Sequence, residues 1–193
     1  MTFDDILSTS QAPDKLAAYV RCYQAAQGED GIASQSALPL RDFAKFMADI
    51  TVLEMVAQER LLFRLAGENV LEKMGRNLVG RDFLDIIPSV IRRQSLAGHL
   101  DMQAKPCGYF MIYENEYVGG QHAFAETLTL PLRKSPDAPA DYFLGFHIQN
   151  DVIGVNLYQK EPALIVGYQL SSFVDIGFGI PDANDLPAIK PDR

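Results

Sequence analysis

The chain has 193 residues, of which 48% are hydrophobic and 22% charged, a balance typical of a globular protein. Its formal net charge of -8 argues against a nucleic-acid partner and against an anionic membrane surface, because both require a concentrated basic surface. The two cysteines lie far apart, no segment reaches the apolar length of a membrane span, and the acidic N-terminus does not resemble a signal peptide, so we expect a cytoplasmic protein without disulfides.

The first predicted helix spans residues 13–27 and follows a polar lead-in. Pro13 suits its first turn, where a missing N–H leaves no hydrogen bond unmade. An apolar stripe follows it at i, i+3, i+4 and i+7, made of Leu16, Tyr19, Val20 and Tyr23. Residues 28–37 are small and polar and predict a linker. The helix can therefore fold back onto its own chain or pair with a second copy; we favour a homodimer through this stripe, because tyrosines tolerate a partly wet interface.

The sequence period changes from helical to alternating at Thr51 and again at Gly108. These changes predict five strands, near residues 50–57, 60–66, 108–117, 122–132 and 141–149. Short helices are expected between the second and third strands, within residues 68–103. The predicted fold is therefore α+β: a five-stranded antiparallel sheet with helices on one face, plus the N-terminal helix.

After residue 150 the pattern weakens to short β-like pieces at 164–166 and 173–177. The last residues contain three prolines and little to bury, which predicts a frayed tail. We therefore divide the chain into an N-terminal helix and linker (1–37), a central domain (38–150) and a partly disordered C-terminal extension (151–193).

Four motifs in this order resemble a known family. They are LPLRDF at 38–43, FRLAGENV at 63–70, MGRNLVGRDFLD at 74–85 and AETLTLPL at 125–132. Together with two strands, a helical stretch and a three-strand meander, they resemble a single-domain PAS subfamily common in alphaproteobacteria. The chain departs from that pattern at Glu68, where the subfamily usually has a small hydroxyl residue after Arg-Leu-Ala-Gly.

The resemblance implies sensing or signalling by binding, and it supplies no catalytic residues. We therefore expect a stand-alone PAS module that is not an enzyme, binds a small ligand or a protein, and signals in trans through a partner. The cofactor remains open. His99 lies where haem-binding PAS domains carry a ligand, but no other haem signal accompanies it, and the Asn-Cys-Arg motif of flavin-binding light sensors is missing.

Two polar residues interrupt apolar strand patterns. Glu126 lies on an apolar strand face, and Arg64 stands between Phe63 and Leu65. A buried carboxylate needs a partner or a proton. Glu126 either anchors a ligand or makes a structural hydrogen bond to backbone amides or an arginine, and the structural role is favoured. Arg64 either binds an anion or ties down a loop.

A pocket is predicted between the sheet and the helices of residues 68–103. Its candidate lining residues are Arg64, Tyr109, Met111, Phe124, Glu126 and Phe146. No metal site is expected, because His99, His122 and His147 lack the spacing of a ligand set. Two other functions stay open: a small cone-shaped α+β enzyme with Arg64, His122 and Glu126 in a polar pocket, and a ligand-free structural adaptor.

Overall fold

The segments with period-2 patterns form one mainly antiparallel sheet in the computed structural model, which describes residues 1–57, 59–117, 120–155 and 163–182. In chain order the strands are β1 (Ala33–Ser34), β2 (Ile50–Ala57), β3 (Arg60–Ala66), β4 (Gly108–Glu116), β5 (Gln121–Arg133), β6 (Tyr142–Val155) and β7 (Ala163–Val174). Their order across the sheet is β3-β2-β6-β5-β4-β7. The five predicted strands are confirmed as β2 to β6.

Two further strands enlarge this sheet. β7 pairs antiparallel with β4, so part of the C-terminal segment belongs to the sheet. β1 pairs in parallel with the end of β5, where Ala33 lies opposite Leu132. The residues predicted to be a free linker are thus held in place, because Ile32 and Ala33 are buried.

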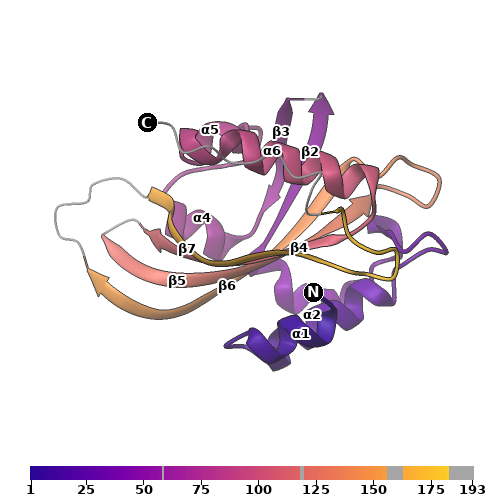
Figure 1. Ribbon diagram of the computed structural model, residues 1–193, viewed down its shortest axis with the longest axis horizontal. Coiled ribbons are helices and arrows are strands. Elements are labelled where there is room, and N and C mark those ends of the chain that lie inside the picture. Colours follow the sequence, from indigo (N-terminus) through magenta and orange to yellow (C-terminus); the bar gives the residue numbers. More distant parts are fainter. Residues whose placement is uncertain (58, 118–119, 156–162, 183–193) are drawn as a thin grey trace.

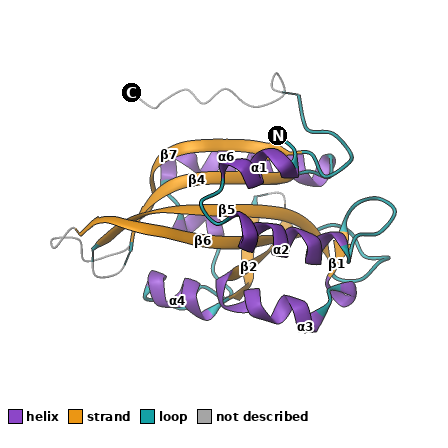
Figure 2. Cartoon of the chain, turned by 90° about the horizontal axis from the view of Figure 1, so that it is seen from below, coloured by secondary structure: helices purple, strands orange, loops and turns teal. Residues whose placement is uncertain are grey.

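Helices cover both faces of the sheet. In chain order they are α1 (Phe3–Thr9), α2 (Pro13–Gln24), α3 (Leu40–Phe43), α4 (Glu68–Met74), α5 (Phe83–Ile86) and α6 (Ser89–Ala104), with 3₁₀ segments at Gln35–Ala37 and Ala44–Asp49. Figure 1 shows α5 and α6 on one side of β4, β5 and β6, and α1 and α2 on the other. Figure 2 shows α1 and α2 running along these strands. The α+β class and the N-terminal helix are confirmed.

The apolar stripe of α2 is buried inside its own chain. All four of its residues, Leu16, Tyr19, Val20 and Tyr23, are at most 4% exposed. Tyr19 stacks on Phe146 of β6, with ring centroids 4.7 Å apart, and its hydroxyl donates a hydrogen bond to the Leu144 carbonyl at 3.1 Å. The stripe is therefore not available as the dimer interface predicted from the sequence, because it covers the sheet instead.

Glu126 holds this N-terminal layer to the sheet. Its carboxylate, on β5, is fully buried and accepts hydrogen bonds from the Ser10 hydroxyl, from the Gln11 N–H at 2.8 Å and from the Asn150 side-chain amide at 3.0 Å. Ser10 and Gln11 form the turn between α1 and α2. Glu126 thus has the structural role that the sequence favoured.

Gly67, in the Arg-Leu-Ala-Gly motif, is required by a close approach between backbones. A Cβ at this position would lie 2.3 Å from the Met47 carbonyl oxygen. The Gly67 N–H donates to the Ile50 carbonyl at 2.8 Å, which ties the end of β3 to the start of β2. The motif therefore fixes the point where the chain leaves the sheet for α4.

Most of the predicted frayed tail, residues 183–193, lies outside the described residues. Within the part of the chain that the structure describes, no helix has the length and apolar character needed to cross a membrane.

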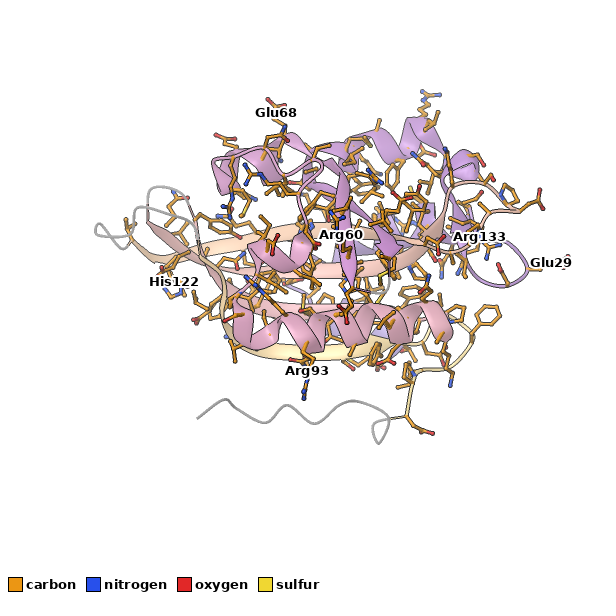
Figure 3. The ribbon with its side chains drawn as sticks, turned by 90° about the horizontal axis from the view of Figure 1, so that it is seen from above. Glu29, Arg60, Glu68, Arg93, His122 and Arg133 are labelled. Atoms are coloured by element: carbon orange, nitrogen blue, oxygen red, sulfur yellow. The ribbon has the colours of Figure 1, made fainter. Side chains whose placement is uncertain are left out.

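We predict that Glu126→Ala lowers the free energy of unfolding by about 3 kcal/mol, because hydrogen bonds to a charged group contribute about 1.5–3 kcal/mol each. Chemical denaturation followed by circular dichroism measures the effect. Glu29→Ala, at an exposed loop carboxylate that Figure 3 shows at the edge of the molecule, is the matched control and should change stability little. Equal stability of the two variants would contradict the anchoring role.

Candidate functional site

A cavity of about 130 Å³ lies between the sheet and the helices α4, α5 and α6. Its floor comes from the sheet side chains that point away from α1 and α2, and its roof from the three helices. It occupies the place predicted for a pocket. Cavities of about 150 Å³ with apolar walls hold a benzene molecule, so this volume suits a ligand with one ring.

Aromatic rings form one wall of the cavity. Phe63 of β3 contacts Phe83 of α5 with centroids 5.9 Å apart, and Phe83 contacts His99 of α6 at 5.7 Å. His99 in turn contacts Phe143 of β6 edge to face, with the ring centroids 4.7 Å apart and an interplanar angle of 90°. Tyr109 of β4 lines the same space. These rings favour contact with an apolar or aromatic ligand.

A hydrogen-bonded row crosses the floor of the cavity. His147 of β6 bonds through Nε2 to the Thr51 hydroxyl at 2.8 Å and through Nδ1 to the Thr127 hydroxyl at 3.0 Å. The Thr127 hydroxyl also bonds the Tyr113 hydroxyl at 2.8 Å. Gly145 leaves room for the row, since a Cβ there would lie 2.8 Å from the Thr51 hydroxyl oxygen.

The two histidines of the cavity are held neutral. Burial and, to a smaller extent, the nearby Lys73 charge lower the pKa of His147 to about 4, although the Asp49 charge acts in the opposite direction. Burial also lowers the pKa of His99, whose Nδ1 is 2.7 Å from the Ser95 carbonyl. Among the described residues no group of three or more histidine, cysteine or acidic side chains is arranged to hold a metal ion.

Lys73, in the last turn of α4, is the one residue with a formal charge among the described residues that line the cavity. It forms no salt bridge with any residue that the structure describes. Burial lowers its pKa, and the Asp49 charge acts in the opposite direction. The Asp49 carboxylate accepts a hydrogen bond from the Asn69 side-chain amide at 2.7 Å. The ammonium group of Lys73 is therefore available to an anion.

Two of the six predicted lining residues, Tyr109 and Met111, line this cavity. The placement of Glu126 and Phe146 there is wrong, because both face the N-terminal layer through the Ser10 and Tyr19 contacts. Phe124 is half-buried and lies outside the lining, and Arg64 is exposed and pairs with Glu54.

The physical reason for this error is strand parity. Tyr109 and Met111 of β4 lie opposite Thr129 and Thr127 of β5, so the small polar face of β5 lines the cavity. The large apolar face was predicted to do so, but it packs under α1 and α2. The residues that sequence reasoning missed are Thr51, Lys73, Thr127 and His147, and the small side chains on alternate positions of β5 were the signal that could have found Thr127.

The polar pocket of the enzyme alternative is not assembled. Arg64 pairs with Glu54 on the outer surface, His122 lies 3.4 Å from the Glu114 carboxylate, and Glu126 is buried beneath the α1–α2 turn. Figure 3 shows His122 at the end of β5 opposite Arg133, at the periphery of the molecule. The three side chains therefore share no site.

The fold and cavity define an α+β module with an internal ligand-sized space. The sequence profile of the PAS domain family matches residues 11–148, and the chain belongs to that family. No curated protein matches the chain.

Among solved structures the chain is similar to a light-oxygen-voltage domain studied with a flavin analogue, at 11% identity and a TM-score of 0.43, covering 58% of this chain and 84% of that one. It is also similar to the Rhodobacter sphaeroides LOV protein, at 18% identity and a TM-score of 0.42, covering 72% and 70%. A third is the PAS domain of an HTR-like protein from Haloarcula marismortui, at 15% identity and a TM-score of 0.40, covering 57% and 89%.

We predict that acid destabilises the protein as the pH falls from about 6.5 toward about 4. The folded state keeps His147 neutral down to a pKa of about 4, whereas the unfolded chain takes up a proton near its ordinary pKa of 6.5. The stability is therefore complete above about pH 6.5 and is lost below it, by up to about 1.4 kcal/mol per pH unit for one such histidine.

Denaturant midpoints measured across this range for wild type and for His147→Gln check this prediction. The variant should lose less stability than wild type over this pH range. Identical slopes for wild type and His147→Gln would show that His147 does not cause the pH dependence.

Proposed function

We propose that this chain is a PAS sensory module that binds a small ligand in the cavity beneath α4, α5 and α6. The observation that carries the proposal is the combination of an aromatic wall and a hydrogen-bonded polar row around one cavity of about 130 Å³. Apolar walls with a few convergent polar groups are characteristic of small-molecule sites.

The proposed signal passes through β5. Thr127 faces the cavity, and its neighbour Glu126 holds the turn between α1 and α2 on the opposite face. A ligand that shifts Thr127 would move this anchor, because consecutive side chains of a strand point to opposite faces. The N-terminal layer is thus the proposed receiver of the signal.

The remaining parts of the proposal concern the chain as a whole. We propose that residues 38–150 form the sensory unit, flanked by extensions at 1–37 and 151–193, and that the module binds rather than catalyses. A signalling partner in trans is proposed, as is self-association through a surface other than the buried stripe of α2. The proposed cytoplasmic location is supported by Cys22 and Cys107, which are free and buried.

We predict that Gly98→Leu abolishes ligand binding without unfolding the protein. Gly98 of α6 lines the cavity, and a Cβ there would meet no atom within 4 Å, so the leucine side chain can occupy the space. Replacing a mid-helix glycine also favours the helix by roughly 0.5–1 kcal/mol. The matched control is Arg93→Leu on the same helix, because Arg93 is exposed and projects outward in Figure 3.

Two measurements test this prediction. Benzene should raise the melting temperature of wild type and of Arg93→Leu but not of Gly98→Leu. Native mass spectrometry compared with the denatured mass should detect any ligand that co-purifies with wild type and is lost in Gly98→Leu. A wild type that neither carries a ligand nor responds to benzene would refute the proposal.

A further inference from the structure

We propose that the ligand of this cavity is a small planar aromatic monocarboxylate, with its ring against the aromatic wall and its carboxylate on the Lys73 ammonium group. This inference rests on the proposed function, since it names the chemistry of the same site. It follows from the charges, the rings and the size of the cavity, taken in turn.

The charge of the lining selects an anion. Lys73 is the one formally charged side chain among the described lining residues, and aspartate and glutamate do not occur among them. A ligand that carries an ammonium group would find no carboxylate there, and burying an unpaired charge is strongly unfavourable. A ligand with a single negative charge, by contrast, can pair with the positive charge of Lys73.

The state of Lys73 agrees with this selection. Its ammonium group has no salt-bridge partner among the described residues, although Asp49 and Glu72 lie close enough to raise its pKa. Burial dominates and lowers that pKa, because the partly buried ammonium group has lost part of its hydration. A carboxylate is the complement that this group lacks.

The polar row adds places for further ligand atoms but no charge. His147 and His99 are neutral because burial lowers the pKa of both. Thr51, Thr127 and Tyr113 contribute hydroxyl groups that already bond to one another or to His147. A second negative charge on the ligand would therefore have no cation to meet, which excludes dicarboxylates and phosphate esters.

The aromatic wall and the volume select the body of the ligand. Phe63, Phe83, His99 and Phe143 form a connected series of rings, with neighbouring centroids 4.7–5.9 Å apart. Aromatic rings pack favourably edge-to-face or offset against such a wall. The volume of about 130 Å³ admits one ring, since a cavity of about 150 Å³ holds benzene.

Three compounds of one size separate charge from shape: benzoate, its neutral isostere benzamide, and benzene. Isothermal titration should show that wild type binds benzoate more tightly than benzamide. Lys73→Met should weaken benzoate binding by about 10- to 100-fold, the range of a hydrogen bond to a charged group, and leave benzamide binding nearly unchanged. Methionine keeps the apolar stem of the lysine, so the cavity stays lined.

The matched control is Lys15→Met. Lys15 of α2 is exposed, lies outside the cavity lining and is close enough to lower the pKa of Lys73. The Lys15→Met substitution removes one positive charge near Lys73 but leaves the proposed contact between Lys73 and the carboxylate. Benzoate should therefore bind this variant as tightly as it binds wild type. Equal loss in Lys15→Met and Lys73→Met would show a long-range effect of net charge and overturn the contact.

The outcomes distinguish this inference from the proposed function. If benzene and benzamide bind but benzoate does not, the cavity binds ligands and the monocarboxylate inference is wrong. If Lys73→Met weakens benzoate and benzamide equally, the carboxylate does not contact Lys73. If none of the three compounds binds wild type or shifts its melting temperature, and no ligand co-purifies with it, the proposed function itself fails.

Discussion

β5 packs against a different layer on each of its two faces, and the rest of the structure depends on which of its residues lie on which face. On one face Leu128 and Leu130 pack under the N-terminal helices beside the buried Glu126 carboxylate. On the other face the small residues Thr127 and Thr129 leave space beneath α6. Large side chains on both faces would fill the interior, so the cavity exists because β5 divides its large and small residues between the two faces.

Glu126 makes this arrangement specific. A carboxylate on an apolar face is unfavourable unless donors surround it, and the α1–α2 turn supplies the Ser10 hydroxyl and the Gln11 N–H. The N-terminal layer is therefore held by directional polar contacts as well as by apolar packing. Glu126 and Thr127 are neighbours on β5. This one strand therefore lines the cavity and also holds the N-terminal layer.

The interior of the cavity is kept close to neutral. His147 is bonded on both ring nitrogens by threonine hydroxyls, and burial holds it uncharged. Lys73, the one formally charged residue among the described lining residues, lies at the end of a short helix and forms no salt bridge within the part of the chain that the structure describes. The site thus combines an apolar body, a saturated polar row and one unmatched charge, a combination that discriminates among small molecules mainly by charge and size.

The sequence by itself determined the five strands β2 to β6, the antiparallel order of the central meander and the helical segment between Gly67 and Pro106, because period and turn residues are local signals. It also marked Glu126 as a residue that needed partners. Only the tertiary structure decided which face of β5 meets which layer, because alternation defines two faces and does not say what covers each. For the same reason the sequence favours a second copy as the cover of the α2 stripe, whereas in the structure the stripe packs on the chain's own sheet. Lys73 and His147 come from distant segments, and they line one cavity only once the sheet and α4 have packed together.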